Sequence, residues 1–168
     1  MRCIAFLYSL NNEAVYIKDK KFVVRSTESG AEVSGALPIV NKKNNYYVIN
    51  FGNNHIAREY TDIETINLES EYIKLRSSKE FEEVKDFNLS IYRNSKNNIA
   101  IRTYENGTGE TLSCGSATIS VAYALLKDTD KNELLFTSKG GKTKVLIDNE
   151  SITSKANAVI LEQGFLHG

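Results

Sequence analysis

The feature that most constrains this fold is an apolar helix that directly follows a polar, glycine-bearing loop. Ser116 opens the run, whose apolar members are Ala117, Ile119, Val121, Ala122, Ala124, Leu125 and Leu126. A helix that is apolar on all sides is buried on all sides. Most of the remaining chain consists of short β-rich segments. The sequence therefore predicts an α+β fold in which a curved sheet is wrapped around a central helix.

Short runs of β-branched and aromatic residues predict the strands of this sheet. They cover residues 14–17, 22–25, 31–40, 46–51, 88–92, 99–103, 133–137, 142–147, 151–154 and 159–161. Strands joined by short turns pair antiparallel, so we expect an antiparallel sheet. Residues 46–51 lack polar alternation, which indicates a strand covered on both faces.

Two further helices are expected. Residues 3–10 are almost continuously apolar and predict a short buried helix. Within residues 66–76, Leu68, Tyr72 and Leu75 recur at helical spacing with charges between them, which predicts an amphipathic surface helix.

Composition narrows the classes of function. The 168 residues include 21 basic and 21 acidic side chains, so we expect no basic face and no nucleic-acid partner. No apolar window is long enough to span a membrane and the N-terminus lacks a cleavage site, which predicts a cytoplasmic protein without a membrane partner. His55 and His167 are far apart, and no histidine–cysteine cluster has ligand spacing, so no metal site is predicted.

Cys114 is the candidate reactive group, because it stands at the start of the apolar helix. The first N–H groups of a helix, here those of Gly115 and Ser116, lack intrahelical partners and favour a carboxylate or phosphate. The same position favours thiolate over thiol, which predicts a lowered pKa. The alternative is a cysteine that serves only as a small buried hydrophobe.

Several motifs resemble those of the diaminopimelate epimerase family. Residues 104–116 read YENGTGETLSCGS and closely resemble its second catalytic-cysteine motif. The segments Gly52-Asn53-x-His55, Phe87-Asn88-Leu89 and Ser26-Thr27-x-x-Gly30 are similar to further elements in the same order. The resemblance spans nearly the whole chain but only part of the family's length.

The resemblance implies a fold with two similar domains, each a curved antiparallel sheet around a central helix. It predicts one complete unit, residues 41–157 with Cys114, plus a remnant of the first domain, residues 1–40 with a terminal strand in 158–168. The family's first catalytic motif, Cys-Gly-Asn-Gly, is missing from this sequence. Cys3 lies within an apolar run and is expected to be a core residue rather than the second thiol.

The family also implies roles for individual residues, with no cofactor and no metal. Cys114 would be one of two acid/base thiols, and His55 and Glu105 would line the site near the reacting carbon. The N–H groups of Gly115 and Ser116 would hold the substrate α-carboxylate. Asn53, Asn88 and Asn106 would lie toward the distal end, and the family usually has arginine at the last of these positions. That difference leaves the substrate open.

The expected function is cofactor-independent interconversion of LL- and meso-diaminopimelate in lysine biosynthesis, with this chain inactive or nearly so by itself. One alternative is a non-catalytic relative that binds a small amino acid, and another is a related isomerase of the same fold. A thiol hydrolase that uses Cys114 and His55 is a third, although no acyl-transfer motif accompanies them. Apolar side chains in residues 3–10 also predict self-association, such as a homodimer.

Overall fold

The computed structural model describes residues 8–17, 20–95 and 98–158. Its strands are β1 (Glu13–Ile17), β2 (Lys20–Thr27), β3 (Gly30–Ala36), β4 (Ile39–Lys43), β5 (Tyr46–Asn50), β6 (Asn54–Glu59), β7 (Phe87–Ser95), β8 (Asn98–Glu105), β9 (Gly109–Thr111), β10 (Glu133–Ser138), β11 (Gly141–Ile147) and β12 (Ser151–Asn157). The helices are α2 (Leu68–Arg76), α3 (Gly115–Leu126) and the 3₁₀ turn η1 (Lys79–Phe81).

The described strands form one mixed sheet. Their order is β1-β2-β3-β12-β11-β10-β8-β7-β6-β5-β4, and β9 pairs with β8. The expectation of a purely antiparallel sheet is wrong at two junctions, because β6 pairs with β7 and β8 with β10 in parallel. Both connections are long crossovers, one through α2 and one through α3, and a crossover of this kind allows parallel pairing.

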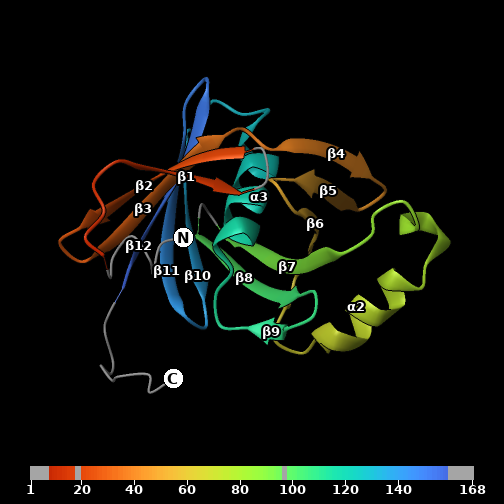
Figure 1. Cartoon of the computed structure of the whole chain (residues 1–168). Helices are drawn as coiled ribbons and strands as arrows, with labels where there is room; N and C mark the ends of the chain where they lie inside the picture. The colour runs from red at the N-terminus through yellow and green to blue at the C-terminus, as the bar shows by residue number, and fades with distance from the viewer. Residues whose placement is uncertain (1–7, 18–19, 96–97, 159–168) are drawn as a thin grey trace, which may run out of the picture.

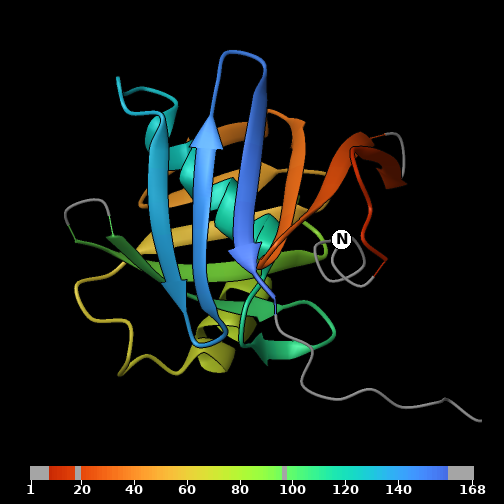
Figure 2. The same cartoon turned by 90° about the vertical axis from the view of Figure 1, so that its left-hand side faces the viewer.

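Helix α3 lies inside the curve of the sheet, as the sequence predicts. In Figure 2 the strands β10–β12 cross in front of α3 while β5–β7 pass behind it. Its buried residues are Ala117, Thr118, Ile119, Ser120, Val121, Ala122, Ala124 and Leu126. The larger apolar ones pack in a core with side chains from strands on both flanks of the helix, among them Ile49, Phe136, Val145 and Ile152. Burial of this apolar surface stabilises the packing of α3 against the sheet.

Helix α2 lies on the outer face of the sheet, beside β7 and β8 (Figure 1). Leu68, Tyr72 and Leu75 are buried in a second core, which confirms the predicted amphipathic helix. The side chain of Asn67 accepts a hydrogen bond from the Ser70 N–H at 2.9 Å and caps the first turn. Strand β5 contributes Tyr46 to this core and Ile49 to the other, so it is covered on both faces as expected.

Some sequence-based boundaries need correction. The single strand expected over residues 31–40 is two strands, β3 and β4, divided at Leu37 and Pro38. Proline lacks an N–H for the ladder, which favours a break there. Strand β6 was not predicted, because polar Asn53 precedes it, polar Asn54 opens it and its apolar stretch is short.

Some predictions concern residues outside the described part of the chain. The strand expected at 159–161 lies there, and so do residues 3–7 of the first expected helix. Its described end is not helical, because Tyr8 and Ser9 form a turn and Leu10 has no regular structure. The division into residues 1–40 with 158–168 and residues 41–157 stays a prediction. Strands β3 and β12, which that division assigns to different units, pair along their whole length.

Candidate active site

The predicted site residues come together at one end of the sheet. The parallel strands β6 and β7 begin there, and His55 of β6 pairs with Asn88 of β7. Strand β8 ends there at Glu105, one residue after Tyr104, which pairs with Leu89 of β7. Since Ile56, Leu89 and Tyr104 face the core beneath α2, the alternating residues His55, Asn88 and Glu105 face the side of α3. Helix α3 begins at this end, directly after Cys114.

Cys114 occupies the N-cap position of α3 and is buried, with 7% of its surface exposed. Its Sγ lies 3.5 Å from Ser116 Oγ, and its carbonyl accepts the Thr118 hydroxyl at 2.9 Å. Burial raises the pKa of the Cys114 thiol, against the lowering effect of hydrogen bonds from Ser116 and the Ala117 N–H. The predicted lowering of this pKa is therefore wrong, because loss of solvent outweighs the helix terminus. Burial therefore favours the protonated thiol of Cys114 over the thiolate.

Glu105 is the charged neighbour of this thiol. Its carboxylate accepts a hydrogen bond from Thr111 Oγ1 at 2.7 Å, and its charge and its hydrogen bond with Cys114 both raise the cysteine pKa. A thiol beside a carboxylate keeps its proton, because the negative charge disfavours the thiolate. Cys114 and Glu105 thus form a pair that favours proton donation.

His55 is fully buried, and it orients Asn53. Its Nε2 lies 3.0 Å from Asn53 Oδ1, which makes Nε2–H the donor. Nδ1 has no hydrogen-bond partner among the described residues. Burial lowers the pKa of His55 to about 4, so the ring is neutral at physiological pH. The described hydrogen bond of His55 is with Asn53 and not with Cys114, so the histidine–cysteine pair that a thiol hydrolase uses is not formed here.

The loop geometry explains the position of Asn53. Gly52 has a φ of 92°, a conformation that favours glycine, and its N–H donates to Asn50 Oδ1 at 3.2 Å. The Phe51 N–H donates to the Asn53 carbonyl at 3.1 Å and closes the turn between β5 and β6. The Gly-Asn pair therefore places an exposed amide at the end of the sheet where Cys114 lies.

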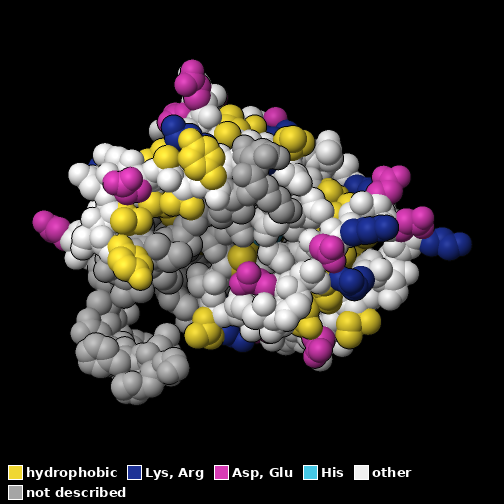
Figure 3. Space-filling view, in the orientation of Figure 1, with side chains coloured by type: hydrophobic (Ala, Val, Ile, Leu, Met, Phe, Trp, Pro, Cys, Tyr) yellow, Lys and Arg dark blue, Asp and Glu magenta, His cyan; other side chains and the backbone are white. Residues whose placement is uncertain are grey.

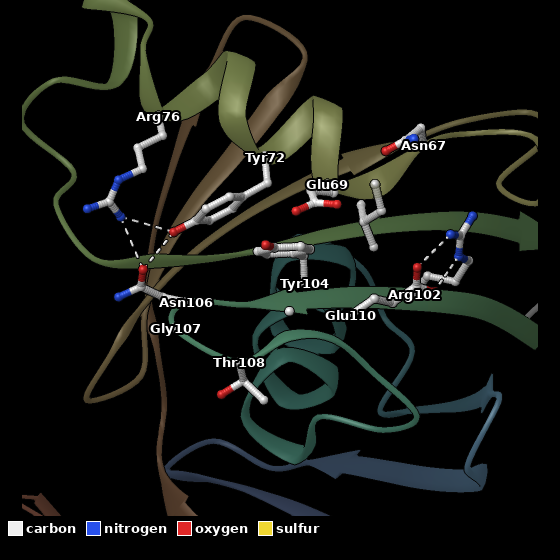
Figure 4. Close-up of a pocket in the computed structure, with 12 residues that line it drawn as sticks. Asn67, Glu69, Tyr72, Arg76, Arg102, Tyr104, Asn106, Gly107, Thr108 and Glu110 are labelled. Atoms are coloured by element: carbon white, nitrogen blue, oxygen red, sulfur yellow. Dashed lines mark hydrogen bonds and ion pairs between the residues drawn. The ribbon is translucent and has the colours of Figure 1, made fainter.

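Asn88 and Asn106 connect the site to α2. The Asn106 N–H donates to Asn88 Oδ1 at 3.0 Å, which fixes the backbone just after Glu105. The Asn106 side chain points toward α2, where its Oδ1 accepts from Tyr72 Oη at 2.7 Å and from Arg76 Nη1 at 3.1 Å (Figure 4). Tyr72 was predicted as a core residue and Arg76 had no predicted role; nothing in the local sequence links them to Asn106.

The first turn of α3 offers the N–H groups of Gly115 and Ser116, both half-buried. Their use as a carboxylate site stays a prediction. Cys114 lines a cavity of about 10 Å³ in the described part, with Thr103, Thr111 and Ser138 among the other walls. Thr111, which holds Glu105, is a site residue that the sequence analysis missed, although it lies within the quoted motif.

Other features of the described residues concern metals and membranes. They contain no cluster of three or more histidine, cysteine, aspartate or glutamate side chains that is placed to hold a metal ion. Within the same ranges, no helix has the length and hydropathy needed to cross a membrane. On the face shown in Figure 3, acidic and basic side chains are mixed over the side where α2 lies.

The fold is shared with solved structures of the phenazine biosynthesis PhzF class. A PhzC/PhzF protein from Clostridium difficile superposes with a TM-score of 0.58 at 14% identity, covering 98% of this chain and 69% of that protein. A PhzF-family protein from Bacillus anthracis gives 0.55 at 14% identity, covering 80% and 60%. At this identity the similarity defines the fold alone.

The sequence defines the family. Residues 47–161 match the diaminopimelate epimerase family model, which is more than half of the chain. A diaminopimelate epimerase of Buchnera aphidicola is 33% identical over 111 residues, 66% of this chain and 38% of that protein. One of Afipia carboxidovorans is 32% identical over 117 residues, 68% and 40%. The chain belongs to the diaminopimelate epimerase family, and it spans less than half the length of these relatives.

Proposed function

We propose that this chain supplies the Cys114 half of a cofactor-independent epimerase site that acts on the α-carbon of diaminopimelate. The observation that supports it best is the meeting of three motifs at one end of the sheet. Asn53 with His55, Asn88, Glu105 and Cys114 come from different parts of the sequence and lie around the start of α3.

The chemistry assigns a direction to Cys114. Epimerisation removes the α-proton from one face of the carbon and returns a proton to the other, so an acid and a base are needed on opposite sides. A neutral Cys114 whose pKa is raised by burial and by Glu105 fits the proton donor. The N–H groups of Gly115 and Ser116 would stabilise the carboxylate as charge develops on the carbanion. Among the described residues, Cys114 is the free cysteine. The second acid/base group therefore has to come from outside these residues.

Proton exchange in heavy water tests the proposal. With diaminopimelate as substrate, we expect slow exchange without inversion of the centre. The minor thiolate form of Cys114 removes the α-proton from one face, the thiol exchanges this proton with heavy water, and a deuteron returns to the same face. Cys114→Ala should lower the exchange rate by about 10²-fold or more. Ser113→Ala is the matched control, because this neighbour is exposed and lies outside α3. No exchange above the buffer rate would sink the proposal, and inversion by the chain alone would show that it holds both acid/base groups.

A second candidate is an amino-acid-binding relative without catalysis. The raised pKa of Cys114 favours it, since burial is also what a structural cysteine shows. Binding of diaminopimelate that is unchanged in Cys114→Ala, together with no exchange in either protein, would support this candidate over the epimerase.

A further inference from the structure

A pocket of about 740 Å³ lies between α2 and the turn that joins β8 to β9. Its walls include Asn67, Glu69, Tyr72, Arg76, Tyr104 and Asn106 (Figure 4). Tyr72 and Tyr104 stack with ring centroids 4.5 Å apart and planes inclined by 25°, which gives the pocket an aromatic wall. The pocket is large enough for one end of an amino-acid substrate.

The two arginines of this pocket differ in how their charges are balanced. Arg102 donates to both carboxylate oxygens of Glu110 at 2.8 Å, and Nη1 also donates to the carbonyls of Ile63 and Ile66. Lys139 binds the same Glu110 at 3.0 Å. These two cations lower the pKa of Glu110 to about 2, the effect of Arg102 being the larger. Arg102 is therefore committed to a structural ion pair.

The positive charge of Arg76 is only weakly compensated by the acidic side chain near it. Its Nη1 donates to two neutral acceptors, Tyr72 Oη at 3.0 Å and Asn106 Oδ1 at 3.1 Å. Its Nη2 lies 3.9 Å from Asp86 Oδ1, and both of these side chains are more than half exposed. Glu69 lies on the same face of α2 but about 10 Å away along the helix axis, so it does not neutralise the guanidinium. Arg76 is thus held in place by neutral groups and keeps donors for an anion.

The same contacts connect Arg76 to the proposed reaction centre. Asn106, which holds the guanidinium, follows Glu105 in the chain, and consecutive Cα atoms are about 3.8 Å apart. Asn88 fixes this backbone by accepting the Asn106 N–H. Glu105, the last residue of β8, faces Cys114, and the next residue, Asn106, contacts Arg76. These two consecutive residues therefore connect the thiol to the guanidinium.

We propose that Arg76 is a specificity-determining residue that binds a carboxylate at the non-reacting end of the substrate, with Asn106 and Tyr72 as its positioning residues. The proposal rests on the proposed function, in which the substrate carries a second carboxylate. The planar guanidinium offers two parallel N–H groups to such a group. A substrate that lacks the second carboxylate would leave Arg76 without its anion.

A pair of ligands that differ in this carboxylate tests the proposal. Meso-diaminopimelate and lysine share the amino-acid end and the methylene chain, but lysine lacks the second carboxylate. In NMR titrations of the full chain we expect tighter binding of diaminopimelate, by about ten- to hundredfold, as a charged hydrogen-bonded pair provides. Arg76→Gln should reduce this preference to near one, and Arg76→Lys should recover part of it.

The matched control is Lys74→Gln, which removes a charge from α2 at an exposed position whose ion pair is with Glu71. It should keep the full preference, and far-ultraviolet circular dichroism should show intact structure in all variants. A preference that survives in Arg76→Gln, or no preference in the unmodified chain, would overturn the proposal. A preference for the diacid without any α-proton exchange would support the role of Arg76 and contradict the proposed epimerase chemistry.

Discussion

Acidification offers a direct measurement of how deeply His55 is buried. The folded His55 has a pKa of about 4 because burial disfavours the charged ring, whereas an exposed histidine has the ordinary value of 6.5. Between these two values the unfolded chain binds a proton that the folded chain does not. Unfolding therefore becomes more favourable as pH falls through this window.

The magnitude follows from the two pKa values. From pH 7 to pH 5, His55 should lower the free energy of unfolding by about 2 kcal/mol, and the complete loss below pH 4 approaches about 3 kcal/mol. The folded ring has no exposed surface, so solvent does not screen this effect. A loss of this size is a large fraction of the stability of a single domain.

Urea denaturation at pH 7 and pH 5 measures this loss, with the chain and its His55→Gln variant compared at both values. Glutamine cannot be protonated, and its side-chain amide can replace the Nε2–H donor to Asn53. The variant should therefore lose about 2 kcal/mol less than the parent over the same interval. NMR of the imidazole protons should show that His55 does not titrate near pH 6.5.

Two results would refute the reasoning. An equal loss of stability in the parent and in His55→Gln would show that His55 is not the group responsible. A His55 signal that titrates with an ordinary pKa would show that the ring is accessible to water in the folded protein.

The remaining predictions concern the thiol, the sheet and the core. Glu105→Gln removes a charge that raises the pKa of Cys114, so the thiol should become more acidic and its alkylation at neutral pH should be faster, as followed by peptide-resolved mass spectrometry. Gly30→Ala places a Cβ against the carbonyl of Ala156, which should separate β3 from β12 and cost about 2 kcal/mol in urea denaturation. Ile99→Ala empties a fully buried position in the core around α3 and should cost about 3 kcal/mol by the same method.

Each of these has a control. Glu83→Gln removes an exposed charge away from the cysteine and should leave the alkylation rate unchanged. Glu28→Ala, at the exposed turn beside Gly30, should cost less than about 0.5 kcal/mol. Slower alkylation in Glu105→Gln, or losses for Gly30→Ala and Ile99→Ala no larger than that of Glu28→Ala, would contradict the structure.

The sequence by itself determined the features that depend on local pattern. The apolar run after Cys114 required an enclosed helix, and the spacing of Leu68, Tyr72 and Leu75 required an amphipathic one, because both follow from the helical period. The order of the motifs around Asn53, Asn88 and Cys114 likewise indicated the family. The two helices are encoded in neighbouring residues, and the motifs and their order are read directly along the chain, so none of these properties needed tertiary information.

Only the tertiary structure decided the properties that depend on distant residues. The parallel pairings of β6 with β7 and of β8 with β10 arise from crossovers whose paths the sequence does not state. The contact of Arg76 with Asn106 joins residues 30 positions apart. The pKa of Cys114 moved opposite to the local expectation, because the helix terminus is a local effect whereas burial and the charge of Glu105 are set by the surrounding fold.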